Sequence, residues 1–398
     1  MIEIKDHSGL SGIPKEIFSP ENTNELITFL KNNTDSKFRI GAGLSGVSAA
    51  AVPLEDEIFI DFSNLKELKW IDKLEGVFFA AAGNTMLEIK SFVEKEGWEF
   101  PILPGSLRNA TIGGMIACNG GGPLSLSYGK IGNFIRAIEI ICADGKKMNF
   151  GSLCKKISEG PDFTKLFIGS EGTLGFINNV ILQCVKIPKT KLYRISHSSF
   201  YELANSIRNF IKLNPLYLEM AEPDALKFSS GERDSVIWLG LKEDEELEIN
   251  NLIELGFEIS AFSSEYLKER FDIGMNLQSY KKFLDLDISF PLKHTAEILT
   301  SLKKLFNKNK LETAFFGHAG DGNWHIHVFY EKDNPIDEVI SKSFDEILFK
   351  FGGHLSGEHG IGRIHKERYI HFKDENYKNL YQALKLFLDP KSQLPSIF

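Results

Sequence analysis

Glycine is spread unevenly along the 398 residues, and its clustering in the first half most constrains how this chain can fold. Three clusters fall at residues 41–46, 113–122 and 169–175, with small hydroxyl residues in or beside each of them. A single cluster of this kind is most simply a tight turn in an α+β domain. Three of them indicate loops that approach a large polar ligand, because glycine lets the backbone come close to it.

The elements expected around these clusters are short. The sequence predicts one strand at 57–62 and another at 76–82, on either side of the segment 66–72. It predicts a further strand at 137–143. Helical spacing of apolar residues predicts a helix at 86–96. The first half therefore alternates short strands with turns of small residues.

The pattern changes near Pro188. Between residues 191 and 262 the order strand, helix, strand, strand, helix, strand predicts a ferredoxin-like cap domain. Its helices are expected at 201–213 and 244–255, and its clearest strand at 235–241. Further helices are expected at 264–277, 295–308 and 335–351, and further strands at 285–290, 312–317 and 324–330.

Composition narrows the functional classes. The net charge of −8 opposes non-specific binding to nucleic acid, which needs a basic face. None of the four cysteines forms a CxxC pair, so no iron–sulfur cluster or structural zinc site of that type is encoded. The N-terminus lacks the features of a signal peptide, and no run of about 18 apolar residues is present. We therefore expect a cytoplasmic protein, with peripheral attachment to the inner membrane through a partner left open.

The first glycine cluster follows an expected strand. Residues 38–46 read FRIGAGLSG, so a strand runs into a loop whose N–H groups can form a concave nest for a pyrophosphate. This is not the Rossmann fingerprint, because no GxGxxG opens a helix that is followed by an acid about 20 residues later.

Three more segments complete the pattern. Residues 104–106 read PGS, residues 110–122 read ATIGGMIACNGGG, and residues 169–177 read GSEGTLGFI. Together and in this order, over roughly residues 15–187, the segments closely resemble the FAD-binding domain of the vanillyl-alcohol oxidase (PCMH-type) superfamily, a span on the scale of a whole domain. The resemblance implies that the first half binds FAD.

The resemblance also implies which residues contact the cofactor. They are Gly41, Ala42, Gly43, Leu44, Ser45, Pro104, Gly105, Ser106, Thr111, Gly113, Gly114, Ala117, Asn119, Gly121 and Ile177. The pyrophosphate loop departs from the family pattern, since it is one residue longer and has three alanines at 49–51 where a Gly-Gly pair often stands. It contains no histidine, so the covalent histidyl–flavin link of some relatives has no candidate, and we expect non-covalent FAD.

Histidine is concentrated late in the chain, where seven of the ten fall between His318 and His371. Residues 317–327 read GHAGDGNWHIH, which predicts two strands joined by a tight turn. Such a hairpin can bring His318 and His325 face to face, and period-two alternation places His325 and His327 on one face of the second strand. Neutral imidazoles suit a borderline divalent metal.

A second histidine loop follows at residues 355–362, LSGEHGIG. Glycines on both sides of the pair Glu358 and His359 let backbone and ligand approach closely. A lone histidine is most simply a structural residue. Two glycine loops with histidine in one chain, one of them with an adjacent acid, favour a functional site.

The motifs HAGDGNxH and GEHGIG resemble the C-terminal domain of FAD-linked 2-hydroxy-acid dehydrogenases. That group includes the glycolate oxidase catalytic subunit, D-lactate dehydrogenases and D-2-hydroxyglutarate dehydrogenase. The resemblance implies that His318, His325 and Glu358 bind zinc or manganese and that His359 is the general base. It implies an α+β fold, with a PCMH-type FAD-binding domain at 1–188 followed at 189–398 by a ferredoxin-like cap and the C-terminal oxidase domain.

The activity implied by the resemblance is oxidation of a small D-2-hydroxy acid to the 2-oxo acid, with hydride transfer to the flavin. Arg270 matches the position where relatives place an arginine, and the resemblance implies that Arg270 and His327 contact the substrate. The alternative for Arg270 is a solvated helix residue. Asp285 stands where dicarboxylate-using relatives carry a lysine, and His327 replaces an asparagine. These differences favour a monocarboxylate of the D-lactate or glycolate class. Electrons are expected to leave through an iron–sulfur partner subunit, electron-transfer flavoprotein or quinone.

Two alternatives remain open. One is a non-redox, FAD-dependent transferase of the same superfamily, such as an ether-lipid synthase. The other is a catalytically silent FAD-binding subunit of a larger oxidase complex. The presence of both histidine motifs disfavours each of them.

Overall fold

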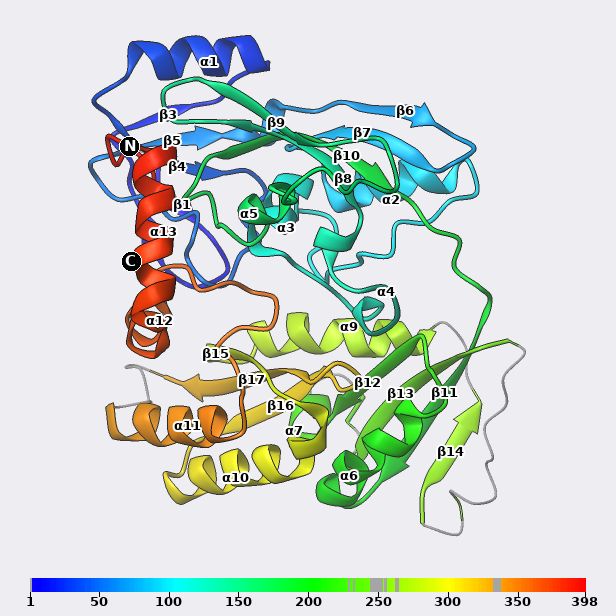
Figure 1. Cartoon of the computed structure of the whole chain (residues 1–398). Helices are drawn as coiled ribbons and strands as arrows, with labels where there is room; N and C mark the ends of the chain where they lie inside the picture. Colours follow the sequence, from blue (N-terminus) through cyan, green and yellow to red (C-terminus); the bar gives the residue numbers. More distant parts are fainter. Residues whose placement is uncertain are drawn as a thin grey trace. The chain divides into compact units, whose positions relative to one another are not determined.

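The computed structural model describes residues 2–227, 230–231, 233–243, 253, 256–261, 265–331 and 338–398. The predicted helix at 244–255 lies outside the described residues, apart from residue 253. The chain divides into two compact units, which can be followed by colour in Figure 1. Unit 1 comprises Met1–Gly121, Gly129–Ile187 and Glu358–Phe398, and unit 2 comprises Gly122–Tyr128 and Pro188–Gly357.

A five-stranded antiparallel sheet forms the larger sheet of unit 1. Its order is β6 (Leu68–Asp72), β7 (Val77–Ala81), β10 (Phe176–Gln183), β8 (Ile135–Ile141) and β9 (Lys147–Gly151). The strands predicted at 76–82 and 137–143 are confirmed as β7 and β8. The loop before β10 carries the third glycine cluster, so the motif at 169–177 leads directly into the central strand.

A smaller parallel sheet carries the first glycine cluster. Its order is β3 (Glu16–Phe18), β5 (Glu57–Asp61) and β4 (Lys37–Gly41). A separate two-stranded sheet consists of β1 (Ile4–Lys5) and β2 (Ser11–Gly12). Strand β5 confirms the strand predicted at 57–62. Phe38 of β4, Ile60 of β5 and Phe176 of β10 share one buried core. This core fixes the strand from which the glycine loop at 42–46 leaves.

Local sequence explains the helices of unit 1. Helix α2 (Met86–Glu94) begins at a capping box, in which Thr85 and Glu88 satisfy each other's backbone N–H groups. Its buried residues lie three and four positions apart, as the helix predicted at 86–96 requires. The other helices are α1 (Thr23–Asn32), α3 (Ile112–Cys118), α5 (Thr164–Phe167), α12 (Lys366–Phe372) and α13 (Glu375–Leu388).

Unit 2 is built on a seven-stranded antiparallel sheet. Its order is β14 (Glu258–Ala261), β11 (Thr190–His197), β13 (Ser235–Lys242), β12 (Tyr217–Ala221), β16 (Thr313–His318), β17 (Asn323–Tyr330) and β15 (Lys282–Ser289). The first four strands follow the spatial order 4-1-3-2 of a ferredoxin-like unit, with α6 (Phe200–Ile211) between the first two in sequence. This agrees with the predicted cap domain.

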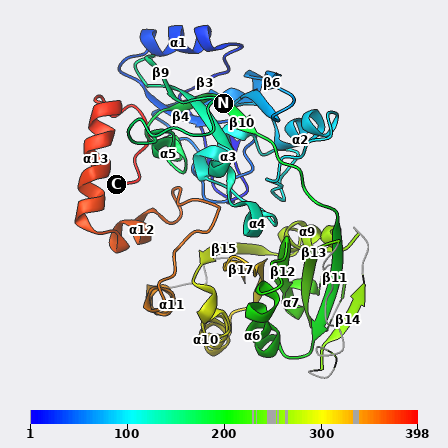
Figure 2. The same cartoon turned by 45° about the vertical axis from the view of Figure 1, so that its right-hand side comes forward.

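Helices cover both faces of this sheet, as Figures 1 and 2 show. On one face lies α9 (Glu265–Gln278), whose Ile273 and Leu277 pack against Trp238 and Phe316. On the other face lie α6, α10 (Thr295–Lys308) and α11 (Glu338–Lys350), with Phe306 of α10 against Phe315. Two short helices complete unit 2, α4 (Ser125–Tyr128) and α7 (Pro223–Leu226).

Candidate active site

Packing in unit 1 brings two of the predicted cofactor segments together. A Cβ added to Gly43 would lie 1.7 Å from the carbonyl oxygen of Asn109, so the loop at 42–46 fits against the chain next to Thr111 only with glycine there. Around Gly105, in contrast, a Cβ would meet nothing within 4 Å. The close packing at Gly43 thus explains the need for glycine there, whereas Gly105 is free of such a constraint.

The second cofactor segment is shaped by its own hydrogen bonds. The Oγ1 of Thr111 accepts the N–H of Gly114 at 3.4 Å and caps α3. Gly113 packs against Ala82, where a Cβ would approach the Ala82 Cβ to 2.8 Å. Asn119 ends the helix with φ of +50°. These residues therefore shape the loop locally, and their contact with FAD stays a prediction.

The remaining predicted cofactor residues also lie in unit 1. Gly41 ends β4, and Ala42, Leu44 and Ser45 follow it in the loop. Pro104 and Ser106 lie before α3, Ala117 lies within α3, and Gly121 lies after it. Ile177 is buried in β10. Ala49, in the longer loop, is buried with φ of +60°. That left-handed conformation explains why glycine often stands at such a position.

Glu171 of the motif at 169–177 anchors the GEHGIG loop within unit 1, a role that sequence reasoning missed. Its two carboxylate oxygens accept the N–H groups of Ile361 at 2.8 Å and Gly362 at 2.7 Å. Burial raises the pKa of Glu171, and the two N–H donors oppose that rise. A Cβ on Gly360 would come within 3.1 Å of the same carboxylate, so the glycine also makes room for this contact.

In unit 2, strand register gathers the histidines on the face of the sheet that α9 covers. Phe316 of β16 pairs with His325 of β17, which places His318 and His325 on the same face with ring centroids 5.4 Å apart. The predicted hairpin geometry of these two residues is thus confirmed. On the other side, β15 places Asp287 opposite His325 and Asp285 opposite His327.

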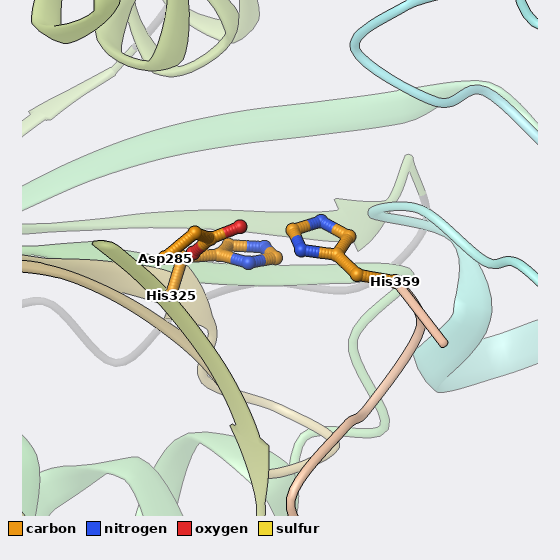
Figure 3. A group of neighbouring side chains, drawn as sticks. All are labelled: Asp285, His325 and His359. Atoms are coloured by element: carbon orange, nitrogen blue, oxygen red, sulfur yellow. The ribbon is translucent and has the colours of Figure 1, made fainter. Parts of the chain in front are cut away.

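The three predicted metal ligands lie close together. Atoms of His318, His325 and Glu358 that can bind a metal all lie within 4.8 Å of one another. Ligand atoms about 2 Å from one ion are at most about 4 Å from one another, so atoms within 4.8 Å need only small side-chain shifts to share an ion. A second group with the same property consists of Asp285, His325 and His359, whose side chains point toward one another in Figure 3. His325 belongs to both groups.

Asp287, part of the DISFP segment at 287–291, holds the segment that leads to Glu358. Its carboxylate accepts Asn323 Nδ2 at 2.6 Å, Ser356 Oγ at 2.8 Å and the N–H of Gly357 at 2.9 Å. The same carboxylate lies 3.6 Å from Nδ1 of His325. Because Gly357 precedes Glu358 directly, Asp287 limits where that ligand can be placed. Sequence reasoning found no role for Asp287.

Glu219 is a further residue that sequence reasoning missed. It lies on β12 with a side chain only 1% exposed, and its carboxylate contacts His318 Nδ1 at 2.8 Å and Arg270 Nε at 2.9 Å. Burial alone would raise the pKa of Glu219, but His318 and Arg270 outweigh it and hold that pKa below its usual range. The only sequence signal was a lone acid within the apolar run at 217–221.

The two predicted substrate residues lie on this face as well. Arg270 of α9 is buried, paired with Glu219, and 5.0 Å from the ring centre of Phe316, so the alternative that it is a solvated helix residue is wrong. His327 is stacked on Phe283 with ring centroids 4.0 Å apart, and its Nε2 is 3.6 Å from Oδ1 of Asp285. Contact of either residue with substrate stays a prediction.

His359 and Glu358 adjoin each other in the GEHGIG loop. Their side chains are 27% and 16% exposed, and His359 Nε2 lies 3.9 Å from Oε1 of Glu358. Both side chains are therefore partly open to solvent, unlike the buried His318 and His325.

Two family models match the chain. The family described as "FAD binding domain" matches residues 14–151, and "FAD linked oxidases, C-terminal domain" matches residues 264–395. The chain belongs to the FAD-linked oxidase family, with a PCMH-type FAD-binding domain. The cofactor assigned to the first half is therefore FAD, and the chain is an enzyme of the dehydrogenase and oxidase type.

Curated relatives span nearly the whole chain. It is 28% identical to D-lactate dehydrogenase of Archaeoglobus fulgidus over 95% of this chain and 89% of that protein. It is 26% identical to glycolate oxidase subunit GlcD of Bacillus subtilis, with coverages of 96% and 88%. It is also 26% identical to mitochondrial D-2-hydroxyglutarate dehydrogenase of Danio rerio, with coverages of 97% and 78%.

A solved structure of alkyldihydroxyacetonephosphate synthase has the same fold. Its TM-score is 0.69 at 16% identity, and the match covers 95% of this chain and 75% of that one. The expected α+β fold, a PCMH-type domain followed by the oxidase domain, is confirmed. Among the described residues, no helix has both the length and the apolar character needed to cross a membrane.

Proposed function

We propose that this protein oxidises a small D-2-hydroxy acid of the D-lactate or glycolate class to the 2-oxo acid, using non-covalent FAD and one divalent metal. The observation that carries the proposal is the convergence of His318, His325 and Glu358 within 4.8 Å. The names of the relatives, which include a D-lactate dehydrogenase and a glycolate oxidase subunit, support the substrate class.

The donor set fits a catalytic zinc or manganese. Two imidazoles and one carboxylate are common ligands of these ions, and three protein ligands leave positions open for substrate. When bound, such a metal supplies charge that lowers the pKa of a substrate hydroxyl group. We propose His318, His325 and Glu358 as its ligands, with His318 held through Glu219 and Glu358 placed through Asp287.

His359 is the proposed general base. A neutral imidazole can accept the hydroxyl proton near neutral pH while the hydride leaves the α-carbon. The hydride that leaves the α-carbon carries both electrons, which FAD would accept when bound, and the proton would stay on a ring nitrogen of His359. A carboxylate oxygen of Asp285 and a ring nitrogen of His359 lie within 4.8 Å of each other, so Asp285 would stabilise the charged imidazolium that results.

The charge of the site favours a monocarboxylate. Asp285 is largely buried beside His325 and His327 and would repel a second carboxylate at the far end of a substrate. We propose that the Nη atoms of Arg270 and the ring of His327 contact the substrate, since the Arg270 Nε is already paired with Glu219. A dicarboxylate such as that named for the Danio rerio relative is therefore disfavoured.

Reduced FAD must pass its electrons on. We propose that an external acceptor takes these electrons. The candidates for it are an iron–sulfur partner subunit, an electron-transfer flavoprotein and a quinone. The relative from Bacillus subtilis is itself named as a subunit, which supports a partner chain.

Anaerobic mixing with candidate substrates tests the proposed function. Purified protein is mixed with D-lactate, glycolate and D-2-hydroxyglutarate, and with the L-forms of the chiral acids, while flavin absorbance is followed. We expect D-lactate or glycolate to bleach the flavin and the L-forms to leave it oxidised. Faster bleaching by D-2-hydroxyglutarate would overturn the monocarboxylate proposal. No bleaching by any of these acids would favour the non-redox transferase or the silent subunit.

A further inference from the structure

Three buried side chains that can carry charge contact one another in series, and the last of them is the candidate ligand His318. Arg270 of α9, Glu219 of β12 and His318 of β16 come from three different elements of unit 2, and contacts of 2.9 Å and 2.8 Å join them in that order. All three side chains are less than 10% exposed. Register explains the meeting, since Met220 pairs with Gly317 and thereby brings Glu219 level with His318.

This arrangement decides which nitrogen of His318 can serve a metal. With Glu219 at Nδ1, the Nδ1 proton is held in a hydrogen bond and the lone pair remains at Nε2. A carboxylate on the far side of a ligating imidazole fixes its tautomer and its ring orientation and makes it a stronger donor. A buried carboxylate without a cation would be costly, and Arg270 offsets that charge.

We infer that Glu219 is a positioning residue that holds His318 in the orientation and tautomer needed to bind the metal, with Arg270 as its counter-charge. This inference rests on the proposed metal centre. It extends that centre to two residues that lie 99 and 48 positions before His318 in the sequence.

A second buried pair provides a matched control. Glu222 lies three residues after Glu219, is also buried, and contacts Lys303 of α10 at 2.7 Å. Its partners are Lys303 and the N–H of Phe315. Changing Glu222 therefore perturbs a buried ion pair of the same sheet without touching a candidate ligand.

The test compares Glu219→Gln with Glu222→Gln by metal affinity. FAD-loaded protein is stripped of metal and titrated with zinc in competition with a chromophoric chelator. We expect wild type to bind one zinc, Glu219→Gln to bind it about 10- to 100-fold more weakly, and Glu222→Gln to bind it as wild type does. Glu219→Asp keeps the charge but shortens the reach, so it should also weaken zinc binding if Glu219→Gln does not fold.

A second readout needs no metal. Nitrogen-15 NMR of labelled histidines in the stripped protein should show His318, assigned with His318→Gln, protonated at Nδ1 in wild type and redistributed between tautomers in Glu219→Gln.

Two outcomes separate failure of the inference from failure of the proposed function. Equal zinc affinity of wild type and Glu219→Gln, with an unchanged tautomer, would overturn the role of Glu219 and leave the metal centre standing. Failure of wild type to bind zinc or manganese would overturn the metal centre itself, and this inference with it.

Discussion

His359 is the residue whose proposed role has the sharpest kinetic consequence. If it accepts the substrate proton, His359→Ala should slow flavin reduction by about 10²–10⁴-fold, the usual contribution of a general base. Bound FAD and bound metal should be unchanged, because His359 is not among the three proposed ligands. Stopped-flow reduction by D-lactate or glycolate, normalised to bound FAD, measures this effect.

A structural histidine would behave differently at this position. His359→Ala would then lower the FAD content or the melting temperature while the rate per flavin stayed nearly intact. A loss of less than about tenfold would remove His359 from the base role. His327 would be the next candidate, since it shares a strand face with His325.

Asp285 is the residue proposed to exclude dicarboxylates. Asp285→Lys replaces a negative charge beside His327 with a positive one, so it should improve binding of a second carboxylate. We expect the ratio of kcat/KM for D-2-hydroxyglutarate to kcat/KM for D-lactate to rise by about tenfold or more, which corresponds to about 1.4 kcal/mol. Asp285→Asn is the control that removes the negative charge without adding a positive one. An unchanged ratio in Asp285→Lys would show that Asp285 does not set specificity.

The sequence could predict the proposed ligands but not the residues that support them. His318, His325 and Glu358 lie in two short motifs in which glycine, histidine and an acid occur together. Glu219 is the one acid of β12, Asp287 shares β15 with Asp285, and the partners of both are distant in the chain. Only the pairing of β12 with β16 and of β15 with β17 brings them to the histidines, and strand register between distant segments is not encoded by local sequence.

At the level of elements, the spacing of apolar residues predicted the positions of several strands and helices. Strands β13, β16 and β17 and helices α6, α9 and α10 lie at the predicted places, because their apolar residues recur with the period of each element. Helix α13 had no counterpart among the predicted elements, although Asp374 caps it. Its Lys385 is buried and donates to the carbonyl of Thr173, a long-range contact that the sequence does not reveal.

The contact between α10 and the end of β12 makes stability depend on pH. Burial raises the pKa of Glu222 to about 7, although Lys303 opposes the rise. A carboxyl whose pKa is raised from 4.5 in the folded state holds its proton more tightly there than in the unfolded chain. Its contribution to stability is therefore full below about pH 4.5 and is lost as the pH rises toward 7.

Glu222→Gln removes this pH dependence. The free energy of unfolding of wild type relative to Glu222→Gln should fall between pH 5 and pH 7, with a slope of at most about 1.4 kcal/mol per pH unit. Differential scanning calorimetry of both proteins across this range measures the difference, and Glu75→Gln, which changes an exposed glutamate, is the surface control. A constant difference between wild type and Glu222→Gln would contradict the raised pKa.

At the scale of the whole molecule, the spatial units are not continuous in sequence. Unit 1 takes in residues 358–398 from the end of the chain, and unit 2 takes in residues 122–128 from within the FAD-binding half. A sequence pattern can only divide a chain into contiguous segments. The division into domains of residues 1–188 and 189–398 is of this kind, and it stays a prediction. The proposed FAD contacts all belong to unit 1, whereas His318 and His325 belong to unit 2.

The cofactor itself should be removable without breaking a covalent bond. The loop at 41–51 contains no histidine, so the family's histidyl–flavin link has no candidate there. Acid precipitation of purified protein should leave a yellow supernatant with the spectrum of FAD. Flavin that stays with the protein pellet would contradict the non-covalent proposal, and a purified protein without FAD would contradict the assignment of the cofactor.

Because the proposed FAD residues and two of the three proposed metal ligands belong to different units, the two groups should be lost independently. A chelator that removes the metal should abolish oxidation of D-lactate or glycolate, since no other group in the proposed mechanism lowers the pKa of the substrate hydroxyl. Bound FAD, measured by its absorbance after gel filtration, should be unchanged, and added zinc or manganese should restore turnover. His318→Ala is the matched variant, because it should reproduce the chelated state without a chelator and resist rescue by metal. Full activity of a sample shown to be metal-free by elemental analysis would leave His318, His325 and Glu358 without the proposed role, whereas simultaneous loss of FAD would show that the metal also stabilises the flavin-binding unit.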